Sequence, residues 1–334
     1  MADQELFILE YFAHKFPTVL YDVAPNYDVS EIGIVFLIPG NPGLPKYYVP
    51  YMAYLRAQLP GWRMICTSQA GCDTSASAYA APDTSTYAGL QEQATHKFDV
   101  LKAKLEQHGY FGPEGQAKQV VLIGHSIGCW LLQRLVSQVH KAQFQCSISL
   151  AILLFPTIRD IGQSPTGVKF TALLTRIPTL ANIVANFVYY MTKHSPNAIV
   201  RAIVNVVMKF PPEHAIQATT ALVSSGTVIY RCISLGKDEM LYIKDEPEDS
   251  QVFWGGHWTF LQQQKSKIVA FFAQKDHWVG DHTRAQILEA YADKDNVECI
   301  LASPDDKCQH SFCVNESELM ANYTARWINE KIQG

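Results

Sequence analysis

The amino-acid sequence predicts an α/β fold, in which a mostly parallel central sheet is flanked by helices and a helical cap is inserted into the sheet. Two observations support this prediction. Short runs that are apolar throughout alternate with segments of helical periodicity, as parallel strands covered on both faces do. The alternation then stops, and a long helical stretch follows. We therefore expect residues 1–156 and 263–334 to form one core and residues 157–262 to form the cap.

The elements of the core follow in order along the chain. The first strand, "IGIVFLIPG", is β-branched and ends at Pro-Gly, and its helix has Pro50 near the start. The next helix is long and ends at Gly109, and a further helix follows Ser126. The predicted strands are 32–40, 62–68, 119–125, 146–156, 266–276 and 296–303. Besides the helix after Ser126, the predicted core helices are 47–59, 86–109, 281–292 and 316–332.

Composition and motifs exclude several classes of function. A formal net charge of −4 gives no field that would attract nucleic acid, so we expect no nucleic-acid partner. Zinc-ligand spacing, a phosphate-binding loop and a dinucleotide fingerprint are all lacking, and we expect no metal or cofactor. The first residues do not resemble a secretory signal, and the eight cysteines without CxxC spacing indicate reduced, intracellular thiols.

The motif with the clearest chemistry is "GHSIG", residues 124–128, which matches G-x-S-x-G. It lies between a predicted strand and a predicted helix. In that setting the serine occupies a strained turn, the glycines let strand and helix approach closely, and the hydroxyl projects above the sheet. The motif therefore predicts Ser126 as a nucleophile. The alternative is an ordinary turn in which Ser126 caps the helix.

A serine nucleophile requires a histidine base and a carboxylate that orients it, and in this architecture the chain order is serine, acid, histidine. Asp276 lies at the end of a late strand and is the expected acid, with Asp281 as the fallback. His310 lies in the loop after the last strand and is the expected base. The alternatives are a helix-capping role for Asp276 and an exposed loop position for His310.

The oxyanion of an acyl-transfer intermediate requires two hydrogen-bond donors. One is expected to be the main-chain N–H of Ile127, the residue after the nucleophile. The other is expected in the loop "LIPGNPGLPKYY", where the amide of Asn41 is best placed. The alternative for this loop is an ordinary Pro-Gly turn.

Several longer motifs resemble the lipid droplet-associated hydrolase family, a branch of the α/β-hydrolases. The resemblance runs from about residue 32 to the C-terminus and is weakest in the cap. It implies a serine esterase or lipase with catalytic Ser126, Asp276 and His310, acting on sterol esters or acylglycerols at lipid droplets and the cytosolic face of the endoplasmic reticulum. The motifs are "IPGNPG", "YYVP", "LIGHSIG", "LLFPTI" and "SPTG".

One segment departs from the family pattern. "TSQAGCD" has Gln69 and Cys72 where relatives tend to have histidines, which leaves any role of these two positions open.

The cap sequence has its own pattern. Residues 161–212 contain five basic residues and no Asp or Glu. Apolar residues at helical spacing predict two amphipathic helices that are separated near His194 and Pro196. Such helices suit a membrane or droplet surface, so we expect 168–210 to contact lipid. The apolar positions are Leu180, Ile183, Val184, Phe187, Val188 and Met191 in one helix, and Ile199, Ile203, Val206, Val207 and Phe210 in the other.

The uncharged run 177–192 is too short to span a bilayer, so the cap is expected to lie on lipid. Alternatively, both helices pack on the core as an ordinary lid. The acidic segment that follows, "GKDEMLYIKDEPEDS" (236–250), is predicted to be a solvated helix end and loop.

These expectations give one principal function and two alternatives. The principal one is a serine hydrolase for hydrophobic carboxylic esters, with a neutral-lipid ester as substrate and a lipid surface as partner. The alternatives are a droplet-surface protein whose hydrolase core is weak or inactive, and a soluble esterase or thioesterase for small esters. The acyl and alcohol specificity depends on how the cap packs, which periodicity does not determine.

Overall fold

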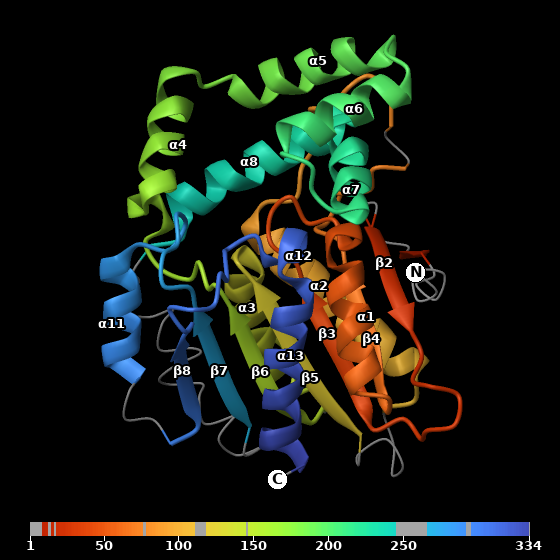
Figure 1. Cartoon of the computed structure of the whole chain (residues 1–334), viewed down its shortest axis with the longest axis vertical. Coiled ribbons are helices and arrows are strands. Elements are labelled where there is room, and N and C mark those ends of the chain that lie inside the picture. Colours follow the sequence, from red (N-terminus) through yellow and green to blue (C-terminus); the bar gives the residue numbers. More distant parts are fainter. Residues whose placement is uncertain are drawn as a thin grey trace.

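The structure is a computed structural model, and its described part forms one eight-stranded sheet with helices on both faces (Figure 1). The strand order is β1-β2-β4-β3-β5-β6-β7-β8; β2 is antiparallel to β1 and β4, and the strands from β4 to β8 are parallel. This confirms the predicted α/β fold. The described residues are 9–12, 15–16, 18–75, 78–110, 118–144, 146–244, 266–291 and 295–333.

The six predicted strands are all present; β5 has the predicted bounds, and the other five are shorter than expected. They are β3 (Gly33–Ile38), β4 (Trp62–Thr67), β5 (Gln119–His125), β6 (Ile148–Leu154), β7 (Lys267–Phe272) and β8 (Val297–Leu301). Every residue of β3 is buried, because helices cover both faces of the central strands. Two strands were not predicted, namely the edge strand β1 (Leu9–Phe12) and its neighbour β2 (Thr18–Val23).

The core helices form two layers. Helices α1 (Val49–Gln58) and α13 (Ser317–Ile328) pack against each other on one face of the sheet. On the other face lie α2 (Leu90–Gln107), α3 (Ile127–Lys141) and α11 (Asp281–Tyr291). Short turns complete these layers: η2 (Pro45–Tyr48) before α1, α12 (Phe312–Asn315) before α13, and η6 (Asn329–Gln333) after it.

A layer of helices lies over the carboxyl ends of the parallel strands, between β6 and β7 in the chain (Figure 1). Helix α8 runs beneath α5 and also contacts α4 and α7. The end of the predicted cap, residues 245–262, lies outside the described residues. The helices are α4 (Pro165–Arg176), α5 (Leu180–Lys193), α6 (Asn197–Val207), α7 (Glu213–Val223) and α8 (Gly226–Tyr242), preceded by η4 (Ile161–Gln163).

Among the described residues, no single helix is both long enough and apolar enough to cross a membrane. Helices α4 and α5 reach the required length and apolar composition only when taken together, and they meet at an angle of 89°.

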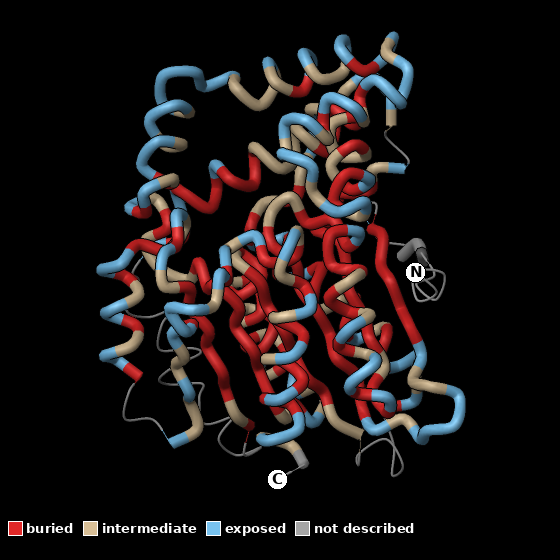
Figure 2. Tube along the Cα trace, in the orientation of Figure 1, coloured by how far each residue is buried: buried red, intermediate tan, exposed pale blue. Residues whose placement is uncertain are grey.

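The predicted amphipathic helices are present as α5 and α6, and most of their apolar stripe is exposed rather than packed on the core (Figure 2). Buried positions are few: Ala185 and Thr192 on α5, and Val200 and Val204 on α6. Phe187 is 63% exposed and Phe210 is 73% exposed. An ordinary lid, packed on both faces, therefore does not describe these helices. The other exposed apolar residues here are Ile183, Tyr190, Met191, Ile199, Ile203, Val206 and Val207.

Candidate active site

Ser126 lies in the tight turn between β5 and α3. Its φ of 55° and ψ of −124° are uncommon for a residue with a side chain. The flanking glycines are required by close packing: a Cβ on Gly124 would lie 2.6 Å from the Gly128 oxygen, and one on Gly128 would lie 2.2 Å from the Ile38 oxygen. The Ser126 side chain makes no N-cap hydrogen bond, so the alternative of a capping serine does not describe it.

The hydroxyl of Ser126 instead meets His310. The Ser126 Oγ lies 2.9 Å from His310 Nε2, and the His310 Nδ1 lies 2.8 Å from Asp276 Oδ2. The other Asp276 oxygen accepts main-chain N–H groups of Trp278 at 2.7 Å and Val279 at 3.2 Å. Burial opposes ionisation of Asp276, but these hydrogen bonds, led by the one from His310, outweigh it and lower its pKa.

The fallback acid, Asp281, lies elsewhere. Its side chain is 82% exposed and pairs with Arg284 at 2.9 Å on α11. The structure therefore brings Ser126, His310 and Asp276 together and leaves Asp281 outside this hydrogen-bonded group.

The two expected oxyanion donors come from the loop after β3 and from the start of α3. Asn41 follows β3 and lines the same cavity as Ser126, and Ile127 is the first residue of α3. No hydrogen bond of either main-chain N–H is found within the described part of the chain. Both amides are thus available to a bound group, and for Ile127 this is common, since the first N–H groups of a helix have no partner within the helix.

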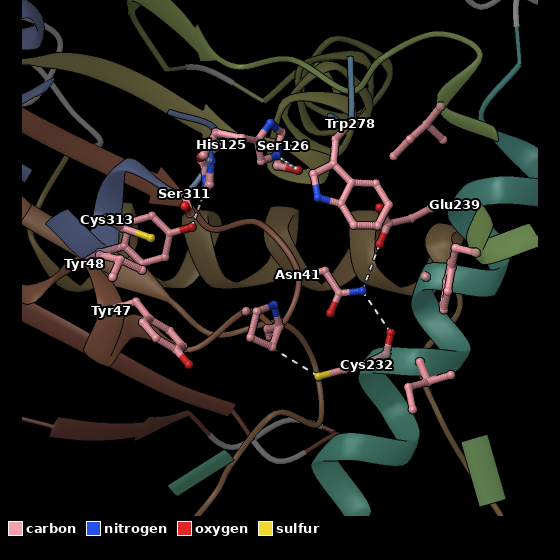
Figure 3. A pocket seen from close by; sticks show the side chains of 18 of the residues that line it. Asn41, Tyr47, Tyr48, His125, Ser126, Cys232, Glu239, Trp278, Ser311 and Cys313 are labelled. Atoms are coloured by element: carbon pink, nitrogen blue, oxygen red, sulfur yellow. Dashed lines mark hydrogen bonds between the residues drawn. The ribbon is translucent and has the colours of Figure 1, made fainter. Parts of the chain in front are cut away.

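A second histidine, His125, links this site to its surroundings (Figure 3). Tyr48 Oη lies 2.6 Å from His125 Nδ1, and His125 Nε2 lies 2.8 Å from the main-chain oxygen of His310. A carbonyl only accepts, so Nε2 carries the proton and Nδ1 accepts from the Tyr48 hydroxyl. That hydroxyl in turn accepts the N–H of Gly40 at 3.0 Å. No pattern in the sequence predicted a role for His125 or Tyr48.

His125 is neutral in this arrangement. Burial, and then the neighbouring His310, lower its pKa to about 3. The tautomer is therefore constant near neutral pH, and three segments are joined by one chain of hydrogen bonds: the loop after β3, the turn at Ser126 and the loop that contains His310.

The site opens into a cavity of about 400 Å³ between the core and the cap. Its walls are largely apolar, and they come from α4, α8 and the loops at the carboxyl ends of the strands. Such a cavity suits a hydrocarbon group beside a few polar atoms. Large apolar side chains in its wall include Phe170, Met208, Ile233, Met240, Trp278 and Val314.

The structure corrects the interpretation of the acidic segment after residue 235. Its first part belongs to α8, where Asp238 and Glu239 are buried rather than solvated. Glu239 lines the cavity and accepts a hydrogen bond from Asn41 Nδ2 at 3.0 Å. The same Nδ2 atom donates to the main-chain oxygen of Cys232 at 2.9 Å. No sequence pattern distinguished Glu239 from its charged neighbours.

The two departures from the family pattern support the loop after β3. Gln69 is buried, and its Nε2 donates to the main-chain oxygen of Pro39 at 2.7 Å. The Gln69 side chain also packs closely against Gly43: a Cβ on Gly43 would lie 2.1 Å from the Gln69 Cγ. Cys72 is buried beside Cys232, whose thiol donates to the main-chain oxygen of Pro42 at 3.5 Å, and the neighbouring Cys232 lowers the pKa of Cys72. The described residues contain no His, Cys, Asp and Glu cluster that would bind a metal ion.

A family model and individual relatives both relate this chain to the same family. Residues 31–313 match the family model for lipid-droplet associated hydrolase. A lipid droplet-associated hydrolase of Gallus gallus is 24% identical over 309 residues, covering 90% of this chain and 85% of the relative. One of Drosophila melanogaster is 23% identical over 299 residues, covering 88% of each.

Solved structures of similar architecture include a soluble variant of monoglyceride lipase from Saccharomyces cerevisiae, with a TM-score of 0.58, 15% identity and coverage of 98% of this chain and 96% of that one. A thermophilic esterase from Thermogutta terrifontis has a TM-score of 0.55 and 14% identity, covering 97% and 98%. At these identities the similarity shows the α/β-hydrolase fold alone.

Proposed function

Because this chain belongs to the lipid-droplet associated hydrolase family, we propose that it is a serine hydrolase that cleaves hydrophobic carboxylic esters, namely sterol esters or acylglycerols. We place its action at the cytosolic surface of lipid droplets or the endoplasmic reticulum. Family and fold both support a hydrolase. The observation that supports the serine mechanism is the hydrogen-bonded series Ser126, His310 and Asp276 at the wall of an apolar cavity.

The mechanism follows from the hydrogen bonds. His310 Nε2 takes the proton of Ser126 as the Oγ attacks the ester carbonyl, and Asp276 stabilises the imidazolium that forms. The amides of Asn41 and Ile127 then stabilise the oxyanion. His310 gives the proton to the departing alcohol oxygen. Water, deprotonated by His310, attacks the acyl-serine; the bond between the acyl carbon and Ser126 Oγ breaks, His310 returns the proton to Oγ, and the carboxylic acid is released.

The exposed faces of α5 and α6 support a lipid surface as the partner. Phe187 and Phe210 are exposed on a segment, 161–212, that has basic but no acidic residues. Burying apolar groups contributes about 0.8 kcal/mol per CH₂, and each basic group near anionic headgroups adds about 1 kcal/mol. A few inserted side chains therefore outweigh the electrostatic attraction, and the cap is proposed to lie on the phospholipid monolayer of a droplet.

A fluorophosphonate probe tests the nucleophile. The full chain should be labelled, and Ser126→Ala should not. Equal labelling of the two proteins would remove Ser126 from the mechanism. Turnover of sterol oleate and trioleoylglycerol by the purified protein then tests the substrate class, with Ser126→Ala as the control.

The same measurements separate the alternatives. Droplet binding without turnover of any ester and without labelling of Ser126 would favour a surface protein with an inactive core. Rapid turnover of short-chain esters, together with no binding to lipid, would favour a soluble esterase or thioesterase.

Flotation with phospholipid-coated triacylglycerol droplets tests the surface. Phe187→Glu and Phe210→Glu together should reduce binding by at least about tenfold, because each removes an exposed phenylalanine that would be worth about 1.5–3 kcal/mol when buried in lipid. Tyr27→Glu is the matched control, since Tyr27 is 98% exposed in the loop between β2 and β3, away from the cap. Equal binding of all three proteins would contradict the proposed surface.

A further inference from the structure

Among the described residues that line the cavity, Glu239 has the only acidic side chain. It projects from α8 beside Trp278 and Asn41 (Figure 3) and is only 4% exposed. A carboxyl group in an apolar cavity is costly unless its oxygens are hydrogen-bonded. The partners of Glu239 therefore indicate what the cavity is suited to bind.

Only one of the two oxygens of this carboxyl group has a hydrogen-bond partner among the described residues. Oε1 accepts from Asn41 Nδ2 at 3.0 Å, whereas Oε2 has no hydrogen-bond partner in the described part of the chain. Burial has the largest effect on the pKa of Glu239, and the negative charge of the neighbouring Asp238 acts in the same direction. Together they raise the pKa of Glu239 to about 7. Near neutral pH the group is present both as carboxylate and as carboxylic acid.

The position of Glu239 relative to the reacting ester follows from Asn41. The main-chain N–H of Asn41 is the proposed donor to the oxyanion, and the side chain of the same residue ends on Glu239. One asparagine side chain thus separates Glu239 from the ester carbonyl. The substrate group that reaches Oε2 must lie within a few bonds of the ester, not at the far end of an acyl chain.

A hydroxyl group fits this position. It donates to a carboxylate and accepts from a carboxylic acid, so it satisfies both forms of Glu239. A carboxylate or phosphate would instead place like charge beside Glu239 and Asp238. Monoacylglycerols and diacylglycerols have a free hydroxyl next to the ester, whereas sterol esters and triacylglycerols have none.

We propose that Glu239 is a specificity residue that binds a free hydroxyl beside the scissile ester, so that the site prefers monoacylglycerols and diacylglycerols to sterol esters and triacylglycerols. The inference rests on the proposed ester hydrolysis at Ser126 and narrows its substrate class.

The test compares two esters that differ only in their hydroxyl groups. Mono-oleoylglycerol and propyl oleate share the acyl chain and a three-carbon alcohol, and both disperse in the same detergent micelles. The full chain should have a kcat/KM at least about tenfold higher for mono-oleoylglycerol, as expected for a hydrogen bond to a charged group. Glu239→Met should bring the ratio to within about twofold of one.

The ratio separates specificity from positioning. Glu239→Met also loses the contact with Asn41, but that loss by itself would lower the rates for both esters equally, so only loss of the hydroxyl contact changes their ratio. Asp238→Asn is the matched control: Asp238 precedes Glu239 on α8, but it accepts from the Tyr87 hydroxyl, and it should keep the wild-type ratio.

Two results would overturn the inference: a wild-type ratio near one, or an unchanged ratio in Glu239→Met. Hydrolysis of both esters at Ser126 without a preference would overturn this inference alone. No hydrolysis of either ester and no labelling of Ser126 would overturn the proposed function itself.

Discussion

Replacing Tyr48 with phenylalanine removes one oxygen atom from the chain of hydrogen bonds behind the candidate active site. The Tyr48 hydroxyl accepts from Gly40 N–H at 3.0 Å and donates to His125 Nδ1 at 2.6 Å. The ring would stay, with its edge-to-face contacts to His125 and Phe312. The variant therefore tests the hydrogen bonds almost separately from the packing.

The expected magnitude follows from the groups left behind. Gly40 N–H and His125 Nδ1 are both buried, and a buried polar group without a partner costs about 1–3 kcal/mol. The unfolding free energy should therefore fall by at least about 2 kcal/mol. His125 would also lose its fixed orientation beneath the His310 carbonyl. Displacing a catalytic group by about 1 Å can cost about a hundredfold, so kcat/KM for an ester should fall by about 10- to 100-fold.

Tyr51→Phe provides a matched control. Tyr51 is equally buried, contacts the same Phe312 ring, and donates its hydroxyl proton to Thr324 Oγ1 at 2.9 Å. Thr324 keeps its own hydrogen bond to the Met320 oxygen, so this variant should lose only about 1 kcal/mol. Its kcat/KM should equal that of the wild type.

Urea unfolding and ester kinetics on the three proteins measure both quantities. The reasoning is refuted if Tyr48→Phe is as active as Tyr51→Phe, or if it is equally stable.

Three further predictions concern the same site. Gly128→Ala should abolish fluorophosphonate labelling and lower the melting temperature, because the new Cβ would lie 2.2 Å from the Ile38 oxygen. Asp276→Asn should lower kcat by about 10³- to 10⁴-fold while the protein stays folded by circular dichroism. Between pH 6.5 and 4.5, His125, with its pKa lowered to about 3, costs stability as pH falls, and Glu239, with its pKa raised to about 7, adds as much. As the pH is lowered across that range, the unfolding free energy of Glu239→Gln should therefore fall by about 1.4 kcal/mol per pH unit relative to that of the wild type, measured by urea unfolding.

Local patterns made much of the core predictable from the sequence. The parallel strands are buried on both faces, so each appears as a continuous apolar run, and β5 followed by "GHSIG" places Ser126 at the turn. Chain order then located Asp276 and His310, which the structure brings to Ser126. Strands β1 and β2 were not predicted: β1 has only four residues, and β2 contains the polar Thr18 and Asp22, so neither appears as a continuous apolar run.

The positions of Glu239 and Tyr48 depended on contacts between distant segments. Glu239 and Asn41 are 198 residues apart, and they meet because α8 crosses above the loop after β3. In the sequence, Glu239 stands among other charged residues at what resembles the solvated end of a helix. Contacts with η4, α4 and the segment around Tyr87 bury that end, and periodicity does not specify how one helix crosses another.

The packing of the cap predicts that the proposed lipid surface can be altered without changing the proposed chemistry. On α5, Ala185 and Thr192 are buried, whereas Phe187 is exposed to solvent. Asn41 is bound by α8, through Cys232 and Glu239, and no hydrogen bond of the described residues links it to α5. A charge at Phe187 should thus weaken droplet binding while micellar esters are still hydrolysed at the wild-type rate. Loss of both together would mean that the exposed face of α5 acts on Asn41 through α8, and that the surface is part of the active site.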